Sequence, residues 1–366
     1  MKTLVDILVQ PKLLAKIPTK NQSLIVAEAR YFNMLAQLNY LCEEQNIFPT
    51  LPKKLQTHLQ SADFIYNNQC RIVNYEREIL QSILTPLNIN WIYLKGCAYQ
   101  LKNIIDFRGR IMSDIDLLVA EKDLALVEQT LKKNGWVAKE ICNYDEKFYR
   151  EWAHEIPPLQ HVLRQVVLDV HFNILPKTIK AAINAKVLFK EAIPLNSLSN
   201  EKVLSPAAML MHSAIHLFYE SEFHKGLRDL YDIAIFIKTY GNDHQFWQKL
   251  IKLHQDIGHQ QSLLLALRYS KKIYQCEIPE YIIHYYQQYQ PKPVALKILD
   301  FCFVTIFTQS YPPHQKRGFT IAKVILYLRG HLKRMPIALL IPHLTKKIFD
   351  KFKPKNASEP FASKAS

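Results

Sequence analysis

Glycine is scarce in this chain, with eight residues in 366, whereas proline occurs nineteen times. So few glycines argue against a repetitive all-β protein, whose many tight turns need that residue. The six cysteines are scattered and include no Cys-x-x-Cys pair, so neither a zinc ribbon nor a disulfide framework is indicated. This use of cysteine favours a reducing compartment, and we expect a cytoplasmic protein.

Long apolar runs are also missing. No segment reaches the roughly 18 uncharged apolar residues that a membrane span needs. Residues 295–307 are interrupted by Lys297 and Asp300, and the apolar stretch 337–344 is too short. The N-terminus lacks the apolar core and the small-residue cleavage site of a signal peptide. We therefore expect no transmembrane segment and a soluble protein, and contact with a membrane surface stays open.

Acidic residues are outnumbered by basic ones, and the formal net charge is +15 at pH 7. Much of the excess lies near the C-terminus, where only Asp350 and Glu359 oppose a long series of basic residues. That series is Lys316, Arg317, Lys323, Arg329, Lys333, Arg334, Lys346, Lys347, Lys351, Lys353, Lys355 and Lys364. A basic surface suits nucleic acid, acidic membrane or polyphosphate, or is a solvated face. Basic and apolar residues interleave over about 320–353, which suits peripheral attachment to an acidic membrane.

The strongest chemical signal is a pair of carboxylates. Asp114 and Asp116 stand one residue apart and open the apolar run 117–119. On a strand, side chains two residues apart point to the same face. Two like charges on one face are costly unless a cation lies between them.

A second signal precedes this pair. The apolar stretch 91–94 is typical of a short buried strand, and it ends at Lys95-Gly96 before a helical pattern. Such a tight turn into a helix N-terminus is a natural place for a phosphate group.

Together these segments resemble a known family. Lys-Gly after an apolar strand, followed by Arg110-Ile-Met-Ser-Asp-Ile-Asp-Leu-Leu-Val119, is similar to the nucleotidyltransferases of the DNA-polymerase-beta superfamily. Within it, the chain most resembles a bacterial group called nucleotidyltransferase family protein, over about residues 85–240. The resemblance implies a third carboxylate in a Val-x-Leu-Asp-x-His segment. Residues 166–171 supply one, with Asp169 followed by His171.

The resemblance implies an enzyme that moves NMP from an NTP, such as ATP, to a hydroxyl of an acceptor. In that reading Asp114 and Asp116 bind two Mg²⁺ ions, which Mn²⁺ can replace. Asp169 completes one of the metal sites and activates the nucleophile. The acceptor class stays open among tRNA, protein and small molecules.

Residues near the turn and before the carboxylates are expected to bind the nucleotide phosphates: Lys95, Gly96, Cys97, Arg110 and Ser113. The superfamily usually has Gly-Ser where this chain has Gly96-Cys97, so a hydroxyl contact is missing and we expect the charge of Lys95 to compensate. Arg110 has two interpretations. It either binds a phosphate oxygen or pairs with Asp114 or Asp116 as a structural clamp.

Several polar residues are candidates for the acceptor side of the cleft: His171, His216, Arg228 and Asp229. His171 shares a strand face with Asp169 and either positions substrate or is a hydrogen-bonded neighbour. The residues of the later helices could equally form a polar clamp between helices. His154, Glu155 and His161 match no common zinc spacing, and we expect them in a surface loop.

The predicted fold class is α+β, with a small mixed-sheet core of the polymerase-beta type flanked by helices. We expect an N-terminal helical region over 1–85, with helices at about 23–45 and up to 84. The core spans 86–200, a larger helical domain 201–355, and a disordered tail 356–366. Expected C-terminal helices lie at about 206–220, 226–240, 243–256, 261–275, 292–307, 320–334 and 343–353.

An alternative from another functional class stays open. The protein could be a catalytically degenerate relative that binds nucleotide or RNA without turnover, attached or not to a membrane surface by its basic C-terminal helices. Cys97 in the place of the usual serine and the basic C-terminal residues favour this alternative.

Overall fold

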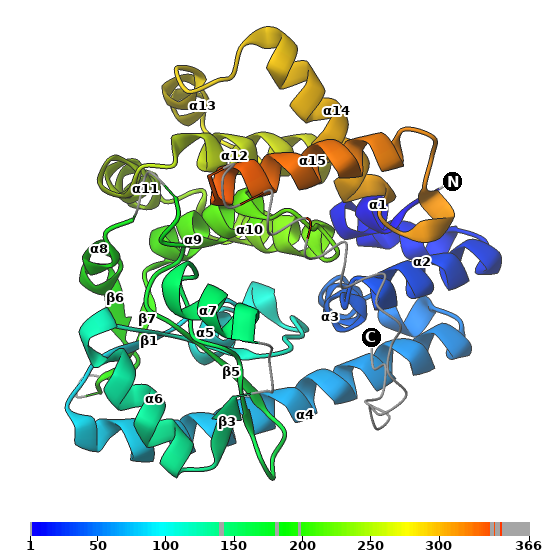
Figure 1. Ribbon diagram of the computed structural model, residues 1–366. Coiled ribbons are helices and arrows are strands. Elements are labelled where there is room, and N and C mark those ends of the chain that lie inside the picture. Colours follow the sequence, from blue (N-terminus) through cyan, green and yellow to red (C-terminus); the bar gives the residue numbers. More distant parts are fainter. Residues whose placement is uncertain are drawn as a thin grey trace.

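The structure is a computed structural model that describes residues 2–138, 143–179, 183–196, 199–336, 340 and 345. In Figure 1 the sheet lies at the lower left, the N-terminal helices at the right, and the C-terminal helices above both. The long helix α4 (Lys53–Leu84) runs along the base of the molecule. This arrangement is the expected α+β architecture, with a mixed sheet between two helical regions.

The sheet has seven strands in the order β3-β4-β5-β2-β1-β7-β6. The strands are β1 (Trp91–Tyr93), β2 (Ile115–Val119), β3 (Trp136–Ala138), β4 (Leu159–His161), β5 (Val167–His171), β6 (Ala192–Pro194) and β7 (Glu201–Leu204). β2 is parallel to β5 and antiparallel to β1, and β1 is parallel to β7. The sequence predicts strands at 91–94, 115–119, 136–138 and 166–172, which correspond to β1, β2, β3 and β5. It does not predict β4, β6 and β7, which are short and carry weak patterns.

Strand β2 occupies the centre of the sheet and every one of its residues is buried. Its apolar run 117–119 fits a strand that is covered on both faces. β7 extends the sheet to Leu204, past the expected end of the core at residue 200. An ion pair joins β7 to α4. The Nε of Arg77 on α4 donates to the carboxylate of the fully buried Glu201 on β7 at 3.0–3.1 Å.

The N-terminal helices besides α4 are α1 (Leu4–Val9), α2 (Thr19–Tyr31) and α3 (Leu35–Glu44). The expectation of one helix over 23–45 is wrong, because the chain breaks between α2 and α3. Asn33 adopts a left-handed backbone with φ of 57°, a conformation that asparagine tolerates better than most residues. The Met34 amide then donates back to the Ala29 carbonyl at 2.7 Å, which ends α2.

The helices of the core are α5 (Lys95–Leu101), α6 (Leu124–Lys133), α7 (Asn143–Glu151) and α8 (Ala185–Lys190). The sequence predicts a helix over about 121–134 that Gly135 ends. α6 ends there, and Gly135 follows it with a left-handed φ of 84°, which glycine adopts without steric cost. The seven-residue α5 follows β1 through a single residue. This short connection places Lys95 next to Asp116 on β2.

The C-terminal helices are α9 (Pro206–Tyr219), α10 (Gly226–Tyr240), α11 (His244–Ile257), α12 (Gln260–Tyr274), α13 (Glu280–Gln287), α14 (Pro293–Gln309) and α15 (Phe319–Arg334). Six of the expected helices are confirmed and α13 was missed. The helix expected at 343–353 lies outside the described residues, apart from residue 345. Within the described chain, no helix is long and apolar enough to cross a membrane.

Candidate functional site

Two aspartates lie opposite each other on the central strands. β2 and β5 run parallel, and Asp116 is the register partner of Asp169. Asp116 is 2% exposed, whereas Asp169 is partly exposed. Asp114 lies just before β2 and accepts a hydrogen bond of 3.1 Å from the Ser113 hydroxyl. The structure therefore gathers the three expected carboxylates at one point of the sheet.

Asp116 has two basic neighbours. Its Oδ1 accepts a hydrogen bond from Lys95 Nζ at 2.8 Å and lies 2.9 Å from His171 Nε2. Burial alone would raise the pKa of Asp116, but the Lys95 charge and the His171 hydrogen bond hold it well below its ordinary value. Burial would also lower the pKa of Lys95, and the charge of Asp116 raises it instead. Both groups are therefore ionised at neutral pH.

The negative charge of Asp169 is less well compensated than that of Asp116. Burial and the neighbouring carboxylates Asp116, Asp114 and Glu155 raise its pKa to about 7. Its Oδ1 is buried and has no hydrogen-bond partner in the part of the chain that the structure describes. A divalent cation would relieve both the excess negative charge and the unsatisfied oxygen. The carboxylate donor set fits Mg²⁺ or Mn²⁺.

A histidine joins the aspartates to a residue outside the motif. His171 Nδ1 lies 3.0 Å from Glu155 Oε2, while its Nε2 contacts Asp116. Glu155 also forms an isolated antiparallel bridge with His171. His154 and Glu155 lie in an irregular segment, as expected, but both are partly buried, and this bridge attaches the segment to the end of β5. The expectation of a surface loop is wrong for His161, which is buried on β4, where Arg164 is its neighbour.

Ligand atoms of His154, Glu155 and His171 lie within 4.8 Å of one another, close enough to hold a metal ion. The contacts favour a different use. Both ring nitrogens of His171 face carboxylates. The His154 ring is stacked on the His171 ring at 5.5 Å with 28° between the planes, so their in-plane lone pairs do not converge on one point. Glu155 and His171 are better described as a hydrogen-bonded support for Asp116.

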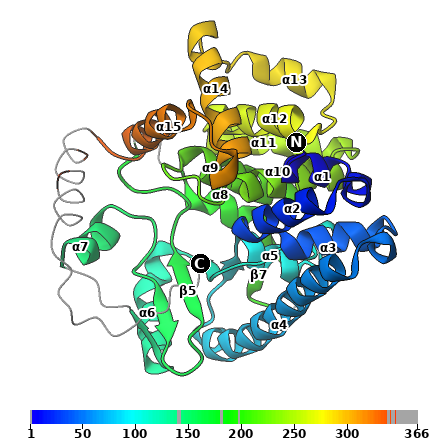
Figure 2. The ribbon, with the colours of Figure 1, turned by 90° about the vertical axis from the view of Figure 1, so that its right-hand side faces the viewer.

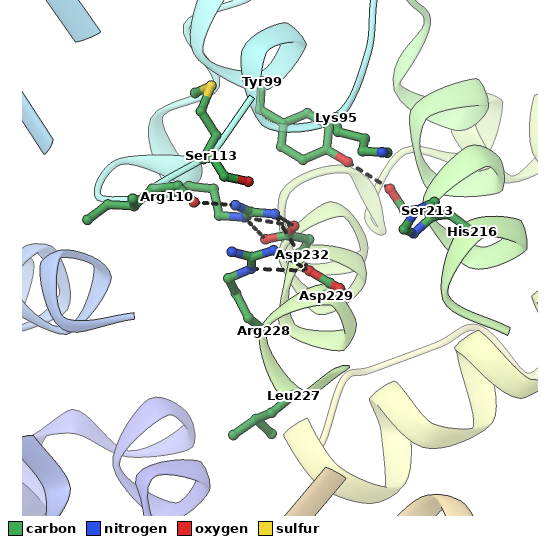
Figure 3. Close-up of polar contacts among 12 residues, drawn as sticks. Lys95, Tyr99, Arg110, Ser113, Ser213, His216, Leu227, Arg228, Asp229 and Asp232 are labelled. Atoms are coloured by element: carbon green, nitrogen blue, oxygen red, sulfur yellow. Dashed lines mark hydrogen bonds and ion pairs between the residues drawn. The ribbon is translucent and has the colours of Figure 1, made fainter. Parts of the chain in front are cut away.

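Arg110 has different partners from those considered from the sequence. Its guanidinium binds both carboxylate oxygens of Asp232 on α10 at 2.8–2.9 Å and lies 3.7 Å from Asp229 (Figure 3). Arg110 is 7% exposed, and the charge of Asp232 raises its pKa although burial opposes the shift. The described contacts of Arg110 include neither Asp114 nor Asp116. We call Arg110 and Asp232 the buried clamp, since they join the segment before β2 to α10.

The turn before α5 is tightly packed. Lys95 has a left-handed φ of 46°, which costs a non-glycine residue roughly 1–2 kcal/mol. A Cβ on Gly96 would lie 3.2 Å from the Cβ of Met112, so Gly96 allows α5 to approach the segment before β2. Cys97 is 1% exposed and burial raises the pKa of its thiol. Of these three residues, only Lys95 forms a hydrogen bond with a carboxylate of the site, that of Asp116.

A cavity of about 580 Å³ opens beside the aspartates. Lys95, Asp169 and His171 line one side of it, and residues of α9 and α15 line the other. The second side includes His216, Tyr219, Glu220, His331 and Arg334. The Arg334 guanidinium binds Glu220 at 2.5 Å, which joins the end of α15 to the end of α9. Lys95, Asp169 and His171 thus share one cavity with the ends of α9 and α15.

The comparison with protein families agrees with this geometry. The sequence model of a family described as uncharacterised nucleotidyltransferase matches residues 18–275, more than half of the chain. The chain belongs to this nucleotidyltransferase family. No curated protein and no solved structure matches it. The match includes all seven strands and ends just after α12, so α13, α14 and α15 lie beyond it.

In this nucleotidyltransferase, the residues expected on the acceptor side are divided between two places. His216 lines the cavity with Lys95, and burial and the charge of Lys95 lower its pKa well below the ordinary value. Arg228 and Asp229 instead pair with each other at 2.9 Å, next to the buried clamp (Figure 3). They do not line this cavity in the described structure. Arg228 and Asp229 are neighbours on α10, and Asp229 also lies 3.7 Å from Arg110 in the irregular segment before β2, so these contacts do not join two helices.

Sequence reasoning missed two contributions to the site. Glu155 comes from an irregular segment without helical or strand periodicity, and its contact with His171 depends on how that segment packs. Arg334 was noted only as part of the basic C-terminus. Its place in the cavity depends on the path of α15 across the ends of other helices, which no local pattern contains.

Proposed function

We propose that this nucleotidyltransferase moves NMP from an NTP to a hydroxyl of an acceptor, with Asp114, Asp116 and Asp169 as ligands of two Mg²⁺ or Mn²⁺ ions. The observation that carries the proposal is the register pairing of Asp116 with Asp169, whose buried Oδ1 is unsatisfied among the described residues. Bound divalent ions would neutralise the triphosphate and lower the pKa of the attacking hydroxyl.

Lys95 supplies positive charge on the phosphate side of the site. Its ammonium group lies on Asp116 Oδ1, and an ammonium group also binds phosphate oxygens as a point charge. Ser113 lies beside Asp114 and is exposed, which suits a further contact to the nucleotide. Gly96 and Cys97 contribute through close packing of α5, and Arg110 contributes through the buried clamp.

His171 and Glu155 position Asp116. A hydrogen-bonded chain from Glu155 through the imidazole to Asp116 fixes the carboxylate in one orientation. Residues that orient metal ligands in this way commonly affect metal affinity or activity 10- to 100-fold. His171 is therefore a positioning residue, and Asp169 is the carboxylate that meets the acceptor hydroxyl.

The acceptor enters through the cavity that Asp169 and His216 line. Its volume of about 580 Å³ suits a small molecule or one terminal unit of a larger acceptor. Tyr219 offers an apolar surface in this cavity, and the neutral His216 offers one hydrogen-bond donor and one acceptor.

Transfer of label tests the proposal. The protein is incubated with Mg²⁺ and with α-³²P-labelled ATP, CTP, GTP or UTP in turn, and total tRNA, protein lysate or a metabolite extract serves as acceptor. We expect label in one pool with the wild type. The Asp114→Asn/Asp116→Asn variant should lose roughly 10³-fold or more, because metal ions stabilise transition-state charge by several kcal/mol. Asp256→Asn, an exposed aspartate on α11, is the matched control and should keep full activity.

Equal labelling by the wild type and the double variant would contradict the proposal. Nucleotide binding that the double variant loses, without label in any pool, would favour the alternative of a protein that binds nucleotide or RNA without turnover. RNA binding through phosphate contacts would then weaken steeply as salt is added.

A further inference from the structure

Helix α15 exposes an apolar face. Ile321 is 59% exposed, Val324 52%, Leu328 45% and Leu332 53%. Their spacing of three and four residues places them on one side of the helix. Ala322, Leu326 and Gly330 are buried on another side. α15 therefore packs on the protein with one face and presents aliphatic side chains to the outside with the other.

Helix α14 continues this apolar surface. Val294 is 72% exposed, Ile298 47% and Phe301 48%, again at intervals of four and three residues. Phe301 reaches the start of α15, because a Cβ on Gly318 would lie 2.9 Å from its ring. We call these seven residues of α14 and α15 the α14–α15 stripe. Contiguous apolar surface of this kind commonly marks a site of interaction.

The segment that carries the stripe is basic, although the exposed Glu222 from the loop before α10 lies near Lys323 and Tyr327. Between residues 292 and 336 the sequence has a single acid, Asp300. The Asp300 carboxylate forms ion pairs with Arg268 and Lys272, with nitrogen–oxygen distances of 2.6 and 3.1 Å. The exposed basic residues in the same range are Lys292, Lys297, Lys316, Arg317 and Lys323. An apolar strip with cations around it complements an anionic lipid surface in both respects.

Helix α4 provides an internal contrast. It also exposes large apolar residues, with Phe64 67%, Ile65 58% and Ile72 42% exposed. Its charges are mixed, since acids and bases alternate along it: Lys53, Lys54, Asp63, Arg71, Glu76, Arg77 and Glu78. In both views α4 lies at the opposite end of the molecule from α14 and α15 (Figures 1 and 2). Apolar exposure and one-signed charge coincide at the α14–α15 stripe and not at α4.

We propose that the α14–α15 stripe rests on an anionic lipid bilayer, with its aliphatic side chains among the acyl chains and the surrounding lysines and Arg317 at the phosphate groups. The last turn of α15 also supplies His331 and Arg334 to the cavity that contains Asp169. On the proposed function, the acceptor then reaches the reacting carboxylates at the membrane surface. The attachment itself requires no catalytic activity.

Co-sedimentation with sucrose-loaded vesicles tests the attachment. Vesicles contain phosphatidylcholine alone or phosphatidylcholine with phosphatidylglycerol. The 366-residue chain should sediment with the anionic vesicles and much less with the neutral ones. Ile321→Ser/Val324→Ser/Leu328→Ser should lower the partition coefficient by roughly tenfold or more, since binding scales with the apolar area buried. Phe64→Ser/Ile65→Ser/Ile72→Ser on α4 is the matched control and should bind as the wild type does.

A charge variant gives an independent readout. Lys316→Gln/Arg317→Gln/Lys323→Gln should weaken binding to anionic vesicles by roughly fivefold per residue, without changing binding to neutral ones. The Asp114→Asn/Asp116→Asn variant should bind vesicles like the wild type, which separates this proposal from the enzymatic one. Circular dichroism confirms that each variant is folded.

Three results would overturn the proposal: no sedimentation with either vesicle, equal sedimentation with both, or unchanged binding by the stripe variant. Analytical ultracentrifugation tests the alternative that a second copy of the chain binds to the stripe. A wild-type dimer that the stripe variant dissociates would assign the surface to a second copy of the chain instead of a bilayer.

Discussion

Two ion pairs, one buried and one partly exposed through Lys95, lie within the same core and differ in how completely their charges are balanced. In the buried clamp, Arg110 and Asp232 bind through paired hydrogen bonds of 2.9 Å, and Asp229 lies further away at 3.7 Å. Lys95 and Asp116 are also in contact, at 2.8 Å. Around them, however, lie Asp114, Asp169 and Glu155, which Lys95 and His171 neutralise incompletely.

The difference separates a structural role from a chemical one. A balanced buried pair holds two elements together, and its main energetic consequence is the cost of removing one partner. An unbalanced group of carboxylates is unfavourable unless a further cation binds. Proximity of an arginine to aspartates in sequence, as for Arg110, does not show which of the two situations applies.

The largest predicted effect on stability comes from breaking the clamp. Asp232→Asn leaves the Arg110 charge buried with weaker partners, and should lower the free energy of unfolding by about 3–5 kcal/mol. Denaturant unfolding measures it. Arg110→Met/Asp232→Leu is the control and should recover most of the loss, because no isolated charge remains. If a folded Arg110→Lys variant instead lost affinity for NTP with normal stability, the phosphate-binding interpretation of Arg110 would be favoured.

A smaller effect, on activity, is expected from changing Glu155, which positions Asp116 through His171. Glu155→Gln should lower the rate of label transfer by roughly 10- to 100-fold, because His171 then orients Asp116 less firmly. The metal concentration for half-maximal activity should rise as well, a change that a loss of general stability does not produce. Glu151→Gln, on the exposed end of α7, should leave both quantities unchanged. An unaltered metal dependence in Glu155→Gln would remove the positioning role.

The smallest effect concerns pH and metal removal. The pKa of Asp169 is about 7 in the folded protein against 3.8 ordinarily, so the folded state binds a proton that the unfolded state has released. In chelator-treated protein, stability should therefore fall as pH rises from about 4 to 7. Relative to Asp169→Asn, which lacks this titration, the wild-type melting temperature should fall by roughly 2 °C or more over that range.

Thermal unfolding at pH 5 and pH 8 measures this difference, with and without Mg²⁺. Added Mg²⁺ should restore the wild type at pH 8 and leave Asp169→Asn little changed, because a ligand that binds only the folded state stabilises it. The same pH dependence in both proteins would show that Asp169 does not carry the unfavourable charge.

Much of the fold follows from local patterns. The spacing of apolar residues predicts α9 to α12 closely. Ser205-Pro206 is a local start signal for α9, with serine at the N-cap followed by proline at the first helical position, and Gly241 is a stop signal for α10. Such periodicity and end signals are contained within one segment. The three-residue strands β4 and β6 are too short for such patterns. The break at Asn33 was also missed, since an asparagine in a helical pattern signals a left-handed turn only weakly.

The sequence by itself determined the carboxylates of the site. Asp114 and Asp116 are two residues apart on one chain, and the motif that contains Asp169 is equally local. The tertiary structure alone decided their partners. Register between β2 and β5 set Asp116 opposite Asp169, packing of α10 took Arg110 away from them, and the bridge to β5 brought in Glu155. Hydrogen bonds and ion pairs act over a few ångströms in space, whereas these partners are separated along the chain by tens of residues or more.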